Sequence, residues 1–376
     1  MLASGRWGEM LSFTETARCG GARTGEVRTP RASFITPAFM PVGTRGAVRT
    51  LTTADLEDLG AAVVLANTYH LMLRPGAELI AERGGLHRFM DWSGHILTDS
   101  GGYQVMSLEP KLDDRGATFR STYDGSTHTL TPERAVELQA LLGSDIAMVL
   151  DVCPPLPSPR PVIEAAVDRT AAWAARARAA HRSMAPPAQA QFGIVQGGLE
   201  VDLRRTSAAR TLEVGFDGYA IGGLSVGEER HERLEPLAAT TELLPADRPR
   251  YLMGVGDPLS ILEAVSVGVD MFDCVLPTRL ARHGTVLTSE GRLNLPNARF
   301  ARDDGPLDPA LANDPAGRWS RAYLRHLLMV GETAATRILT MHNLAWLFDL
   351  MQATRRAIAE DRFGAHAAAV RAVWAR

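Results

Sequence analysis

The sequence MFDCVLPTR, residues 271–279, places an acidic side chain within an apolar, strand-like run that ends in a turn at a proline. A carboxylate is costly to bury in such a run unless it is paired or has a chemical task. We therefore interpret Asp273 as a functional residue and a candidate covalent nucleophile. The run is also the last of a series of similar strands.

Seven comparable apolar, β-branched runs precede Met271–Val275, and segments with helical character separate them. Strands that alternate with helices indicate parallel β-α-β units. Eight units over roughly 250 residues are typical of an α/β fold of the (β/α)8 TIM-barrel type. An open doubly wound sheet is the alternative, but no Gly-x-Gly-x-x-Gly fingerprint follows the first run. The earlier runs are Ile35–Val42, Ala61–Ala66, His95–Thr98, Asp145–Leu150, Gln191–Val195, Gly218–Ile221 and Arg250–Met253, and the helical segments include Thr53–Leu59, Pro132–Leu142, Val162–Ala180, Leu203–Val214, Glu229–Leu244 and Pro258–Val267.

Three parts are predicted along the chain. Residues 1–34 form an N-terminal β extension, a hairpin with turns at Gly20-Gly21 and Gly25. Residues 35–278 form the barrel core. Residues 279–376 form a C-terminal helical subdomain with a β-hairpin at Gly284–Leu295 that turns at Ser289-Glu290-Gly291. Its expected helices are Arg318–Met329, Glu332–Ala357 with a break, and Asp361–Arg376.

Composition restricts the class of protein. The 376 residues carry a formal net charge of −3, so a nucleic-acid partner would need a local basic patch rather than a global excess. The three cysteines are far apart and form no disulfide framework or Cys-x-x-Cys metal signature. No apolar run approaches the length of a membrane span, and no signal-peptide pattern opens the chain. A soluble, cytoplasmic protein without a membrane partner is the expectation.

Polar residues gather where the predicted strands end. Asp99, Asp151, Asp273 and Gln196 follow or close four of the runs, and glycine pairs follow others. Each aspartate alone could be an N-cap of the next helix, but the strand ends of a barrel share one rim. Carboxylates that converge there suit acid–base work with a covalent intermediate. Asp and Gln also offer acceptors to the N1–H and amine of a guanine-like base, on which Tyr103 could stack.

At these residues the chain resembles bacterial tRNA-guanine transglycosylase, the base-exchange enzyme of the queuine tRNA-ribosyltransferase family. The resemblance runs through most of the chain and implies a (β/α)8 barrel with a zinc-bearing subdomain near the C-terminus. The motifs that carry it are Asn67–Gly76 (NTYHLMLRPG), Asp99–Gln104 (DSGGYQ), Gly193–Gly198 (GIVQGG), Gly222–Glu228 (GGLSVGE) and Met271–Arg279.

The resemblance implies roles for individual residues. Asp273 is the expected nucleophile at C1′ of the ribose, and Asp99 the general acid/base. The expected base-binding residues are Ser100, Gly101, Gly102, Tyr103, Asp151, Cys153, Gln196, Gly222, Gly223, Leu224 and Met253. The expected RNA-binding residues are Gly254, Val255, Gly256, Asp257, Pro258, Leu259 and Ser260, with Thr278, Arg279, Leu280, Ala281 and Arg282 at the wobble position.

Substrate and partners follow from the same resemblance. Guanine at position 34 of tRNA would be exchanged for 7-aminomethyl-7-deazaguanine in queuosine biosynthesis. A side chain at Val226, where the eukaryotic form has glycine, points to this smaller base rather than queuine, as does Cys153. Family members are commonly homodimers. Five arginines against one acid between Arg279 and Arg302 suit phosphate contacts.

The segment that aligns with the family's zinc loop departs from its pattern. The three cysteine positions hold Leu311, Asn313 and Ala316, and of the four ligands only His342 is present. A structural zinc site needs four ligands, so we expect no metal and no cofactor, with His342 a satisfied helix histidine. The Ser-Gly that usually precedes the second arginine of the wobble motif is Leu280-Ala281 here.

Two alternatives to tRNA base exchange stay open. The same chemistry could act on another acceptor, DNA or a small nucleoside, and the altered zinc segment motivates this possibility. The chain could also be a non-catalytic partner subunit that binds tRNA. Retention of Asp99, Asp151 and Asp273 argues against the second alternative.

Overall fold

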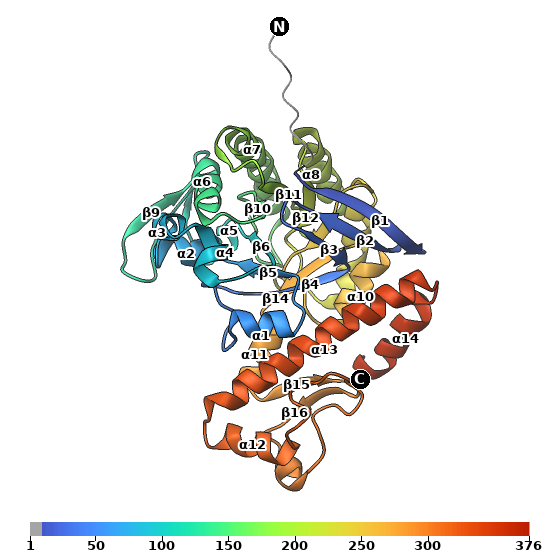
Figure 1. Ribbon diagram of the computed structural model, residues 1–376. Helices are drawn as coiled ribbons and strands as arrows, with labels where there is room; N and C mark the ends of the chain where they lie inside the picture. The colour runs from blue at the N-terminus through green and yellow to red at the C-terminus, as the bar shows by residue number, and fades with distance from the viewer. Residues whose placement is uncertain (1–9, 376) are drawn as a thin grey trace.

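The computed structural model describes residues 10–375, and its centre is an eight-stranded sheet of parallel strands. The strand order is β4-β14-β13-β12-β11-β10-β6-β5. A parallel bridge between Val42 and Leu65 joins the first and last strands and closes the sheet. This confirms the predicted (β/α)8 barrel (Figure 1). The strands are β4 (Ala38–Pro41), β5 (Val63–Ala66), β6 (His95–Thr98), β10 (Ile146–Met148), β11 (Ala190–Val195), β12 (Gly218–Ile221), β13 (Arg250–Leu252) and β14 (Met271–Cys274).

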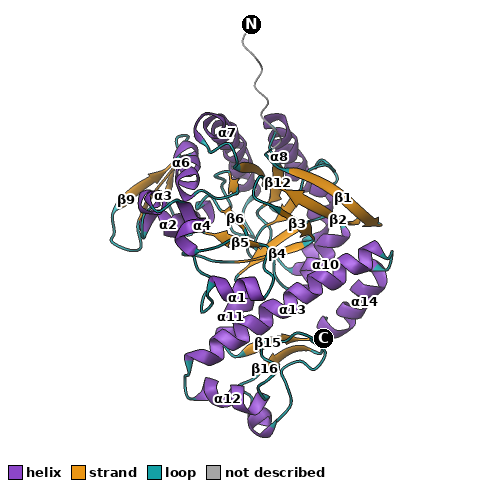
Figure 2. Ribbon diagram, in the orientation of Figure 1, coloured by secondary structure: helices purple, strands orange, loops and turns teal. Residues whose placement is uncertain are grey.

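Helices surround the barrel on its outer side (Figure 2). Local signals explain their bounds: α6 (Pro132–Leu142) begins where Thr131 accepts the N–H of Arg134 and ends at Gly143, which has a left-handed backbone. The remaining helices of this layer are α1 (Thr53–Asp58), α2 (Thr68–Leu73), α3 (Ala77–Glu82), α4 (Gly85–Met90), α5 (Gly102–Met106), α7 (Arg160–Met184), α8 (Val201–Val214), α9 (Leu234–Thr241) and α10 (Pro258–Ser266), with the 3₁₀ turn Arg230–Glu232 before α9.

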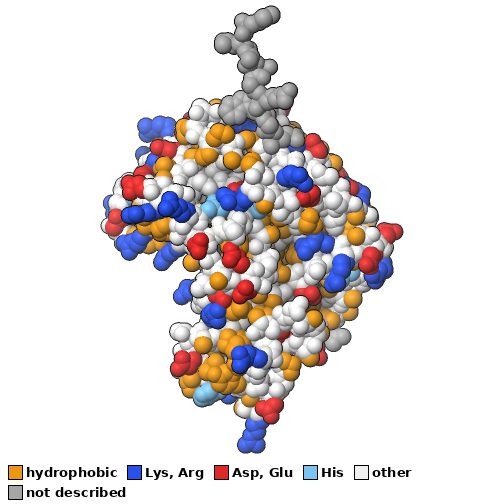
Figure 3. All heavy atoms as spheres, viewed as in Figure 1, with side chains coloured by type: hydrophobic (Ala, Val, Ile, Leu, Met, Phe, Trp, Pro, Cys, Tyr) orange, Lys and Arg blue, Asp and Glu red, His pale blue; other side chains and the backbone are white. Residues whose placement is uncertain are grey.

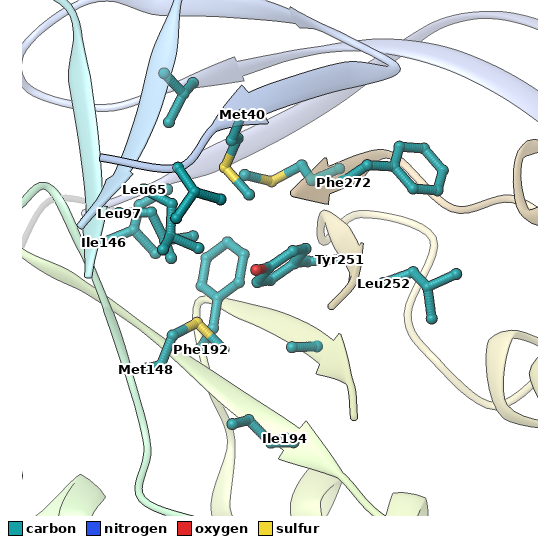
Figure 4. Close-up of a cluster of buried hydrophobic side chains, with 14 of the residues drawn as sticks. Met40, Leu65, Leu97, Ile146, Met148, Phe192, Ile194, Tyr251, Leu252 and Phe272 are labelled. Atoms are coloured by element: carbon teal, nitrogen blue, oxygen red, sulfur yellow. The ribbon is translucent and has the colours of Figure 1, made fainter. Parts of the chain in front are cut away.

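The barrel interior is filled by side chains rather than open. Phe192 and Tyr251 lie in its middle, whereas Leu252 and Phe272 point to the outside (Figure 4). Side chains of a strand alternate between the two faces. Because Tyr251 pairs with Met271 across β13 and β14, Asp273 is two residues further along the inner face. The alternation that fills the core therefore also turns Asp273 inward.

The N-terminal strands β1 (Ser12–Cys19), β2 (Ala22–Arg28) and β3 (Ser33–Thr36) form a separate antiparallel sheet. The turn at Gly20-Gly21 is confirmed, but the predicted turn at Gly25 is wrong. Gly25 lies within β2, where a Cβ would come 2.4 Å from the ring of Phe13, so the residue serves close packing instead. Buried Arg23 pairs with Asp270 at 2.6 Å and fastens this sheet to the barrel.

A second small antiparallel sheet, not anticipated from the sequence, follows α5. Its strands are β7 (Lys111–Leu112), β8 (Ala117–Arg120) and β9 (Thr127–Leu130). They are too short for a periodic pattern to stand out. The loop after β8 returns to the barrel, where the Tyr123 hydroxyl lies 3.0 Å from Nδ1 of His70.

The C-terminal part begins with α11 (Leu276–Arg282) and the predicted hairpin, β15 (Thr285–Thr288) and β16 (Gly291–Asn294). The expected break in the long helix is absent, because α13 (Thr333–Ala359) is continuous. Asn343 of α13 accepts the N–H of Leu287 and donates to the carbonyls of Pro277 and Thr285, which ties α13, the hairpin and the start of α11 together. The other elements are the 3₁₀ turn Ala298–Arg302, α12 (Arg321–Met329) and α14 (Phe363–Trp374).

No helix within residues 10–375 combines the length and apolar character needed to cross a membrane.

Candidate active site

A cavity of about 520 Å³ lies at the carboxyl ends of the barrel strands and has the size of a small-molecule site. It brings together the three predicted carboxylates, although they come from strands far apart in the chain. Most predicted base-binding residues line it as well. The lining includes Asp99, Ser100, Gly102, Tyr103, Asp151, Cys153, Gln196, Gly222, Gly223, Leu224, Met253 and Asp273.

Asp273 is held by two donors that converge on one carboxylate oxygen. The Tyr251 hydroxyl donates to Oδ1 at 2.6 Å and the Gly254 N–H donates to the same atom at 2.7 Å. Burial raises the pKa of Asp273, while these two hydrogen bonds oppose the shift. Tyr251 comes from the inner face of the neighbouring strand, so the barrel itself fixes the orientation of the carboxylate.

Asp99 is held by the turn that follows β5. Its Oδ1 accepts the N–H groups of Thr68 at 2.8 Å and Gly101 at 3.1 Å, and its Oδ2 accepts the Asn67 amide. Burial raises the pKa of Asp99 to about 6, and the charge of Asp273 contributes to the shift despite these hydrogen bonds. A carboxyl group with such a pKa can both take and give a proton near neutral pH.

Asp151 and Gln196 form a buried pair across the cavity from Asp273. The Gln196 amide nitrogen donates to Asp151 Oδ2 at 2.6 Å. This contact directs Gln196 Oε1 the other way, and within residues 10–375 that buried oxygen has no hydrogen-bond partner. Burial raises the pKa of Asp151 to about 6. A carboxylate and an amide side by side on the cavity wall favour a ligand with two or more N–H donors.

Glycines allow these side chains to pack closely against the cavity wall. A Cβ on Gly102 would lie 3.2 Å from Asp151 Oδ1, and one on Gly223 would lie 2.3 Å from Gln196 Oε1. Tyr103 is 59% exposed at the cavity, where its ring is open to stacking. Burial raises the pKa of the Cys153 thiol to about 12, so this residue is a neutral wall of the site and not a nucleophile.

The predicted RNA-binding residues fall into two groups. Gly254, Gly256, Asp257 and Arg279 line the cavity, and Arg282 is exposed beside Arg279. Several others are buried, so their side chains support the loop and do not form its surface: Val255, Pro258, Leu259, Ser260, Thr278 and Ala281. Asp257 accepts the N–H of Ser260 as the N-cap of α10.

Exposed arginines surround the entrance. Arg279 and Arg292 line the cavity, and Arg49 lies close enough to Arg282 to lower its pKa, after the larger effect of burial. Figure 3 shows an indentation between the barrel lobe with α2 and α6 and the C-terminal part, with Lys and Arg side chains on its barrel side. Clustered positive charge of this kind suits a phosphate backbone.

Sequence reasoning missed three residues of the site. Asn67 belongs to a motif that was noted but given no role. Tyr251 of β13 is two residues before the predicted base-binding residue Met253, and this alternation is the signal that the sequence offers. Arg204 gave no signal, since one arginine on a polar helix is unremarkable before its burial is seen.

The segment that aligns with the zinc loop does not fit a metal. His342 is fully buried, with Nδ1 2.9 Å from Asp314 Oδ1 and Nε2 2.8 Å from the Leu287 carbonyl oxygen. The carbonyl oxygen can only accept, so Nε2 carries a hydrogen, and Nδ1 is engaged by Asp314, which leaves neither ring nitrogen free for a metal. No cluster of three or more metal-ligating side chains occurs within residues 10–375.

Comparison with known proteins agrees with this geometry. The family described as queuine tRNA-ribosyltransferase matches residues 18–376. A protein of that name from Desulforudis audaxviator is 55% identical over 344 residues, 91% of this chain and 92% of that protein. A protein of the same name from Lysinibacillus sphaericus is 51% identical over 351 residues, which are 93% of this chain and 92% of that protein. One from Solidesulfovibrio magneticus is 50% identical over 365 residues, 96% of this chain and 98% of that protein.

Fold, site and matches together define a barrel glycosyltransferase of the pentosyltransferase class. The chain belongs to the queuine tRNA-ribosyltransferase family.

Proposed function

We propose that this chain exchanges guanine at position 34 of tRNA for 7-aminomethyl-7-deazaguanine through a covalent ribosyl-aspartate intermediate. The observation that supports this most is the convergence of Asp273, Asp99 and Asp151 on one cavity that Gln196 also lines. One carboxylate is oriented for attack, one is poised for proton transfer, and one faces the position of a base.

The reaction follows from the orientation of Asp273. Since Tyr251 and Gly254 both hold Oδ1, Oδ2 is the oxygen that attacks C1′ of the ribose. The C1′–N9 bond breaks, guanine departs with the bonding pair, and protonated Asp99 supplies a proton to it. N9 of the incoming base then attacks C1′, the ester bond to Asp273 breaks, and the N9 proton passes to Asp99. Two displacements at one carbon retain configuration.

Base recognition uses the cavity wall that Asp151 and Gln196 form. The Asp151 carboxylate accepts from the N1–H and exocyclic amine of a guanine-type base, and the Gln196 amide holds this carboxylate in place. Donors for its carbonyl come from the backbone near Gly223. Pairing polar atoms with polar atoms inside a buried site discriminates strongly against bases that leave them unpaired.

Binding of the free base should weaken in acid. Asp151 accepts N–H groups only as a carboxylate, and with its pKa raised to about 6 it becomes protonated below that pH. Guanine affinity should therefore be constant above about pH 7 and fall about tenfold per unit below pH 6. Calorimetric titration from pH 8 to 5 measures this. Asp99→Asn should keep the dependence and Asp151→Asn should lose it; a flat wild-type profile contradicts the assignment.

The proposed reaction is tested by incorporation of labelled guanine into purified tRNA. Incorporation into a tRNA with G34, and none into the same tRNA with A34, supports it. Labelling of DNA or of a free nucleoside instead would favour the alternative acceptor, and no labelling by folded protein would favour the non-catalytic subunit. We also propose a cytoplasmic, homodimeric enzyme, which sedimentation and fractionation test.

We further propose that the C-terminal segment holds no zinc and that the buried His342–Asp314 pair takes over its fastening role. Asp314 Oδ1 also accepts the Ala316 N–H, and Asp308 accepts from Ser289 across the same loop at 2.6 Å. Loop, hairpin and α13 are thus joined by charge-assisted hydrogen bonds.

His342→Ala should lower the free energy of unfolding by about 1–3 kcal/mol, because it removes the hydrogen bonds of a buried ring to Asp314 and to the Leu287 carbonyl. Chemical denaturation measures the loss, and the exposed His326→Ala on α12 is the control that should change little. Chelators should leave the wild-type melting temperature unchanged. Stoichiometric zinc in the purified protein would overturn the proposal.

A further inference from the structure

Arg204 of α8 is fully buried, and its partners are carbonyl oxygens rather than carboxylates. Nε donates to Gly198 at 2.8 Å, Nη1 to Val195 at 3.1 Å and to Gly222 at 2.7 Å, and Nη2 to Gly223 at 3.1 Å. Burial lowers the pKa of Arg204 to about 10, so the side chain remains a cation at neutral pH.

A buried guanidinium without a bonded carboxylate carries a desolvation cost that its hydrogen bonds must offset. The four carbonyls belong to the end of β11, the loop that follows it and the loop after β12. That loop forms the wall of the cavity beside Gln196. The Arg204 side chain is therefore hydrogen-bonded directly to the backbone of the base site.

The carbonyl contacts determine where the N–H groups point. In a trans peptide the C=O and N–H lie on opposite sides. With the Gly222 and Gly223 carbonyls turned to Arg204, the N–H groups of Gly223 and Leu224 face away from it. The Gly223 N–H is directed at the Cys153 thiol, on the cavity side. Gly223 has φ +66°, which a side chain would strain.

We propose that Arg204 is a positioning residue that fixes these two peptide groups with their N–H donors toward the cavity and so selects a base with a carbonyl beside its N1–H. The inference rests on the proposed base exchange and names the specificity element of the same site. Arg204 itself touches no substrate. Without it, a reversed peptide would present a carbonyl oxygen to the base and repel its carbonyl.

Arg204→Lys tests the proposal, since one ammonium cannot reach four carbonyls in the geometry of a guanidinium. The KM for guanine should rise about tenfold, the value of one well-directed hydrogen bond, with kcat within about threefold. 6-Thioguanine keeps the N1–H and the amine of guanine but has sulfur, a weaker acceptor, in place of the carbonyl oxygen. The preference for guanine over 6-thioguanine should therefore shrink in Arg204→Lys. A merely structural role would lower the active fraction and leave KM and preference unchanged.

Arg250→Lys is the matched control. Arg250 is also largely buried and donates to backbone carbonyls, those of Leu244 and Pro245, at the start of β13 and thus at the opposite end of the barrel. It should lose stability without any change in base preference. Equal preference in wild type and Arg204→Lys overturns the proposal.

Two further results keep the test decisive. If Arg204→Lys shows no cooperative melting, calorimetric binding to the wild type tests carbonyl selection by this loop. Equal affinity for guanine and 6-thioguanine contradicts it, and a clear preference for guanine supports it. If wild type binds guanine selectively but labels no tRNA, the proposed function fails, and the effect of Arg204→Lys on guanine binding alone then decides whether Arg204 positions the loop.

Discussion

Asp273→Asn should abolish guanine exchange and remove the covalent RNA–protein adduct. The amide keeps the size of the side chain and an oxygen that can still accept from Tyr251 and Gly254, so the pocket should persist. It cannot form the ester with C1′. Loss of a nucleophile typically costs several orders of magnitude, and we expect a decrease of about 10⁴-fold or more in kcat. Labelled guanine exchange and denaturing gels measure both effects.

Two controls separate chemistry from folding. Calorimetric binding of guanine to Asp273→Asn should stay within a few-fold of wild type, because the base contacts lie on the wall of Asp151 and Gln196. Tyr251→Phe should slow exchange and still give an adduct, since the nucleophile is retained and only one of two donors to Oδ1 is lost. An adduct with Asp273→Asn would show that another residue attacks.

The position of Asp273 could be predicted from the sequence because barrel geometry is regular. Strand ends of parallel β-α-β units meet at one rim, so three aspartates after three strands had to come together. Helix bounds were also accessible where caps are local: Pro132–Leu142 agrees residue for residue, with Thr131 and Gly143 as its caps. By contrast β7–β9 carry too few residues for a pattern, and the close approach of Gly25 to the Phe13 ring depends on packing.

The supporting residues could not be predicted in the same way. Tyr251 reaches Asp273 from 22 positions away, and Asn67 reaches Asp99 from 32. Arg204 contacts carbonyl groups, which every residue possesses and which leave no mark in the sequence. Side-chain chemistry identifies the reacting groups, whereas the groups that orient them are defined by backbone geometry that only the folded chain shows.

Asp99→Asn should reduce guanine exchange by about 10²–10⁴-fold, the usual contribution of a general acid–base residue. An amide neither protonates the departing guanine nor accepts the N9 proton of the incoming base. Guanine binding should change little, and the pH dependence of exchange that arises from a group with a pKa of about 6 should lose the Asp99 contribution. Stopped-time exchange assays between pH 5 and 8 measure both.

Asn67→Ala is a milder test of the same role of Asp99, because it keeps the carboxyl group and removes only one of its hydrogen bonds. The Asn67 amide stabilises the Asp99 carboxylate, and its hydrogen bond lowers the pKa of that group against the effect of burial. Its removal should raise the pKa of Asp99 further, so the transition in the exchange profile should move to higher pH while activity persists. An unshifted profile in Asn67→Ala, or full activity in Asp99→Asn, would assign the proton transfer to another group. Because Asp151 also titrates near pH 6, the comparison is made at saturating guanine, where its effect on base affinity no longer limits the rate.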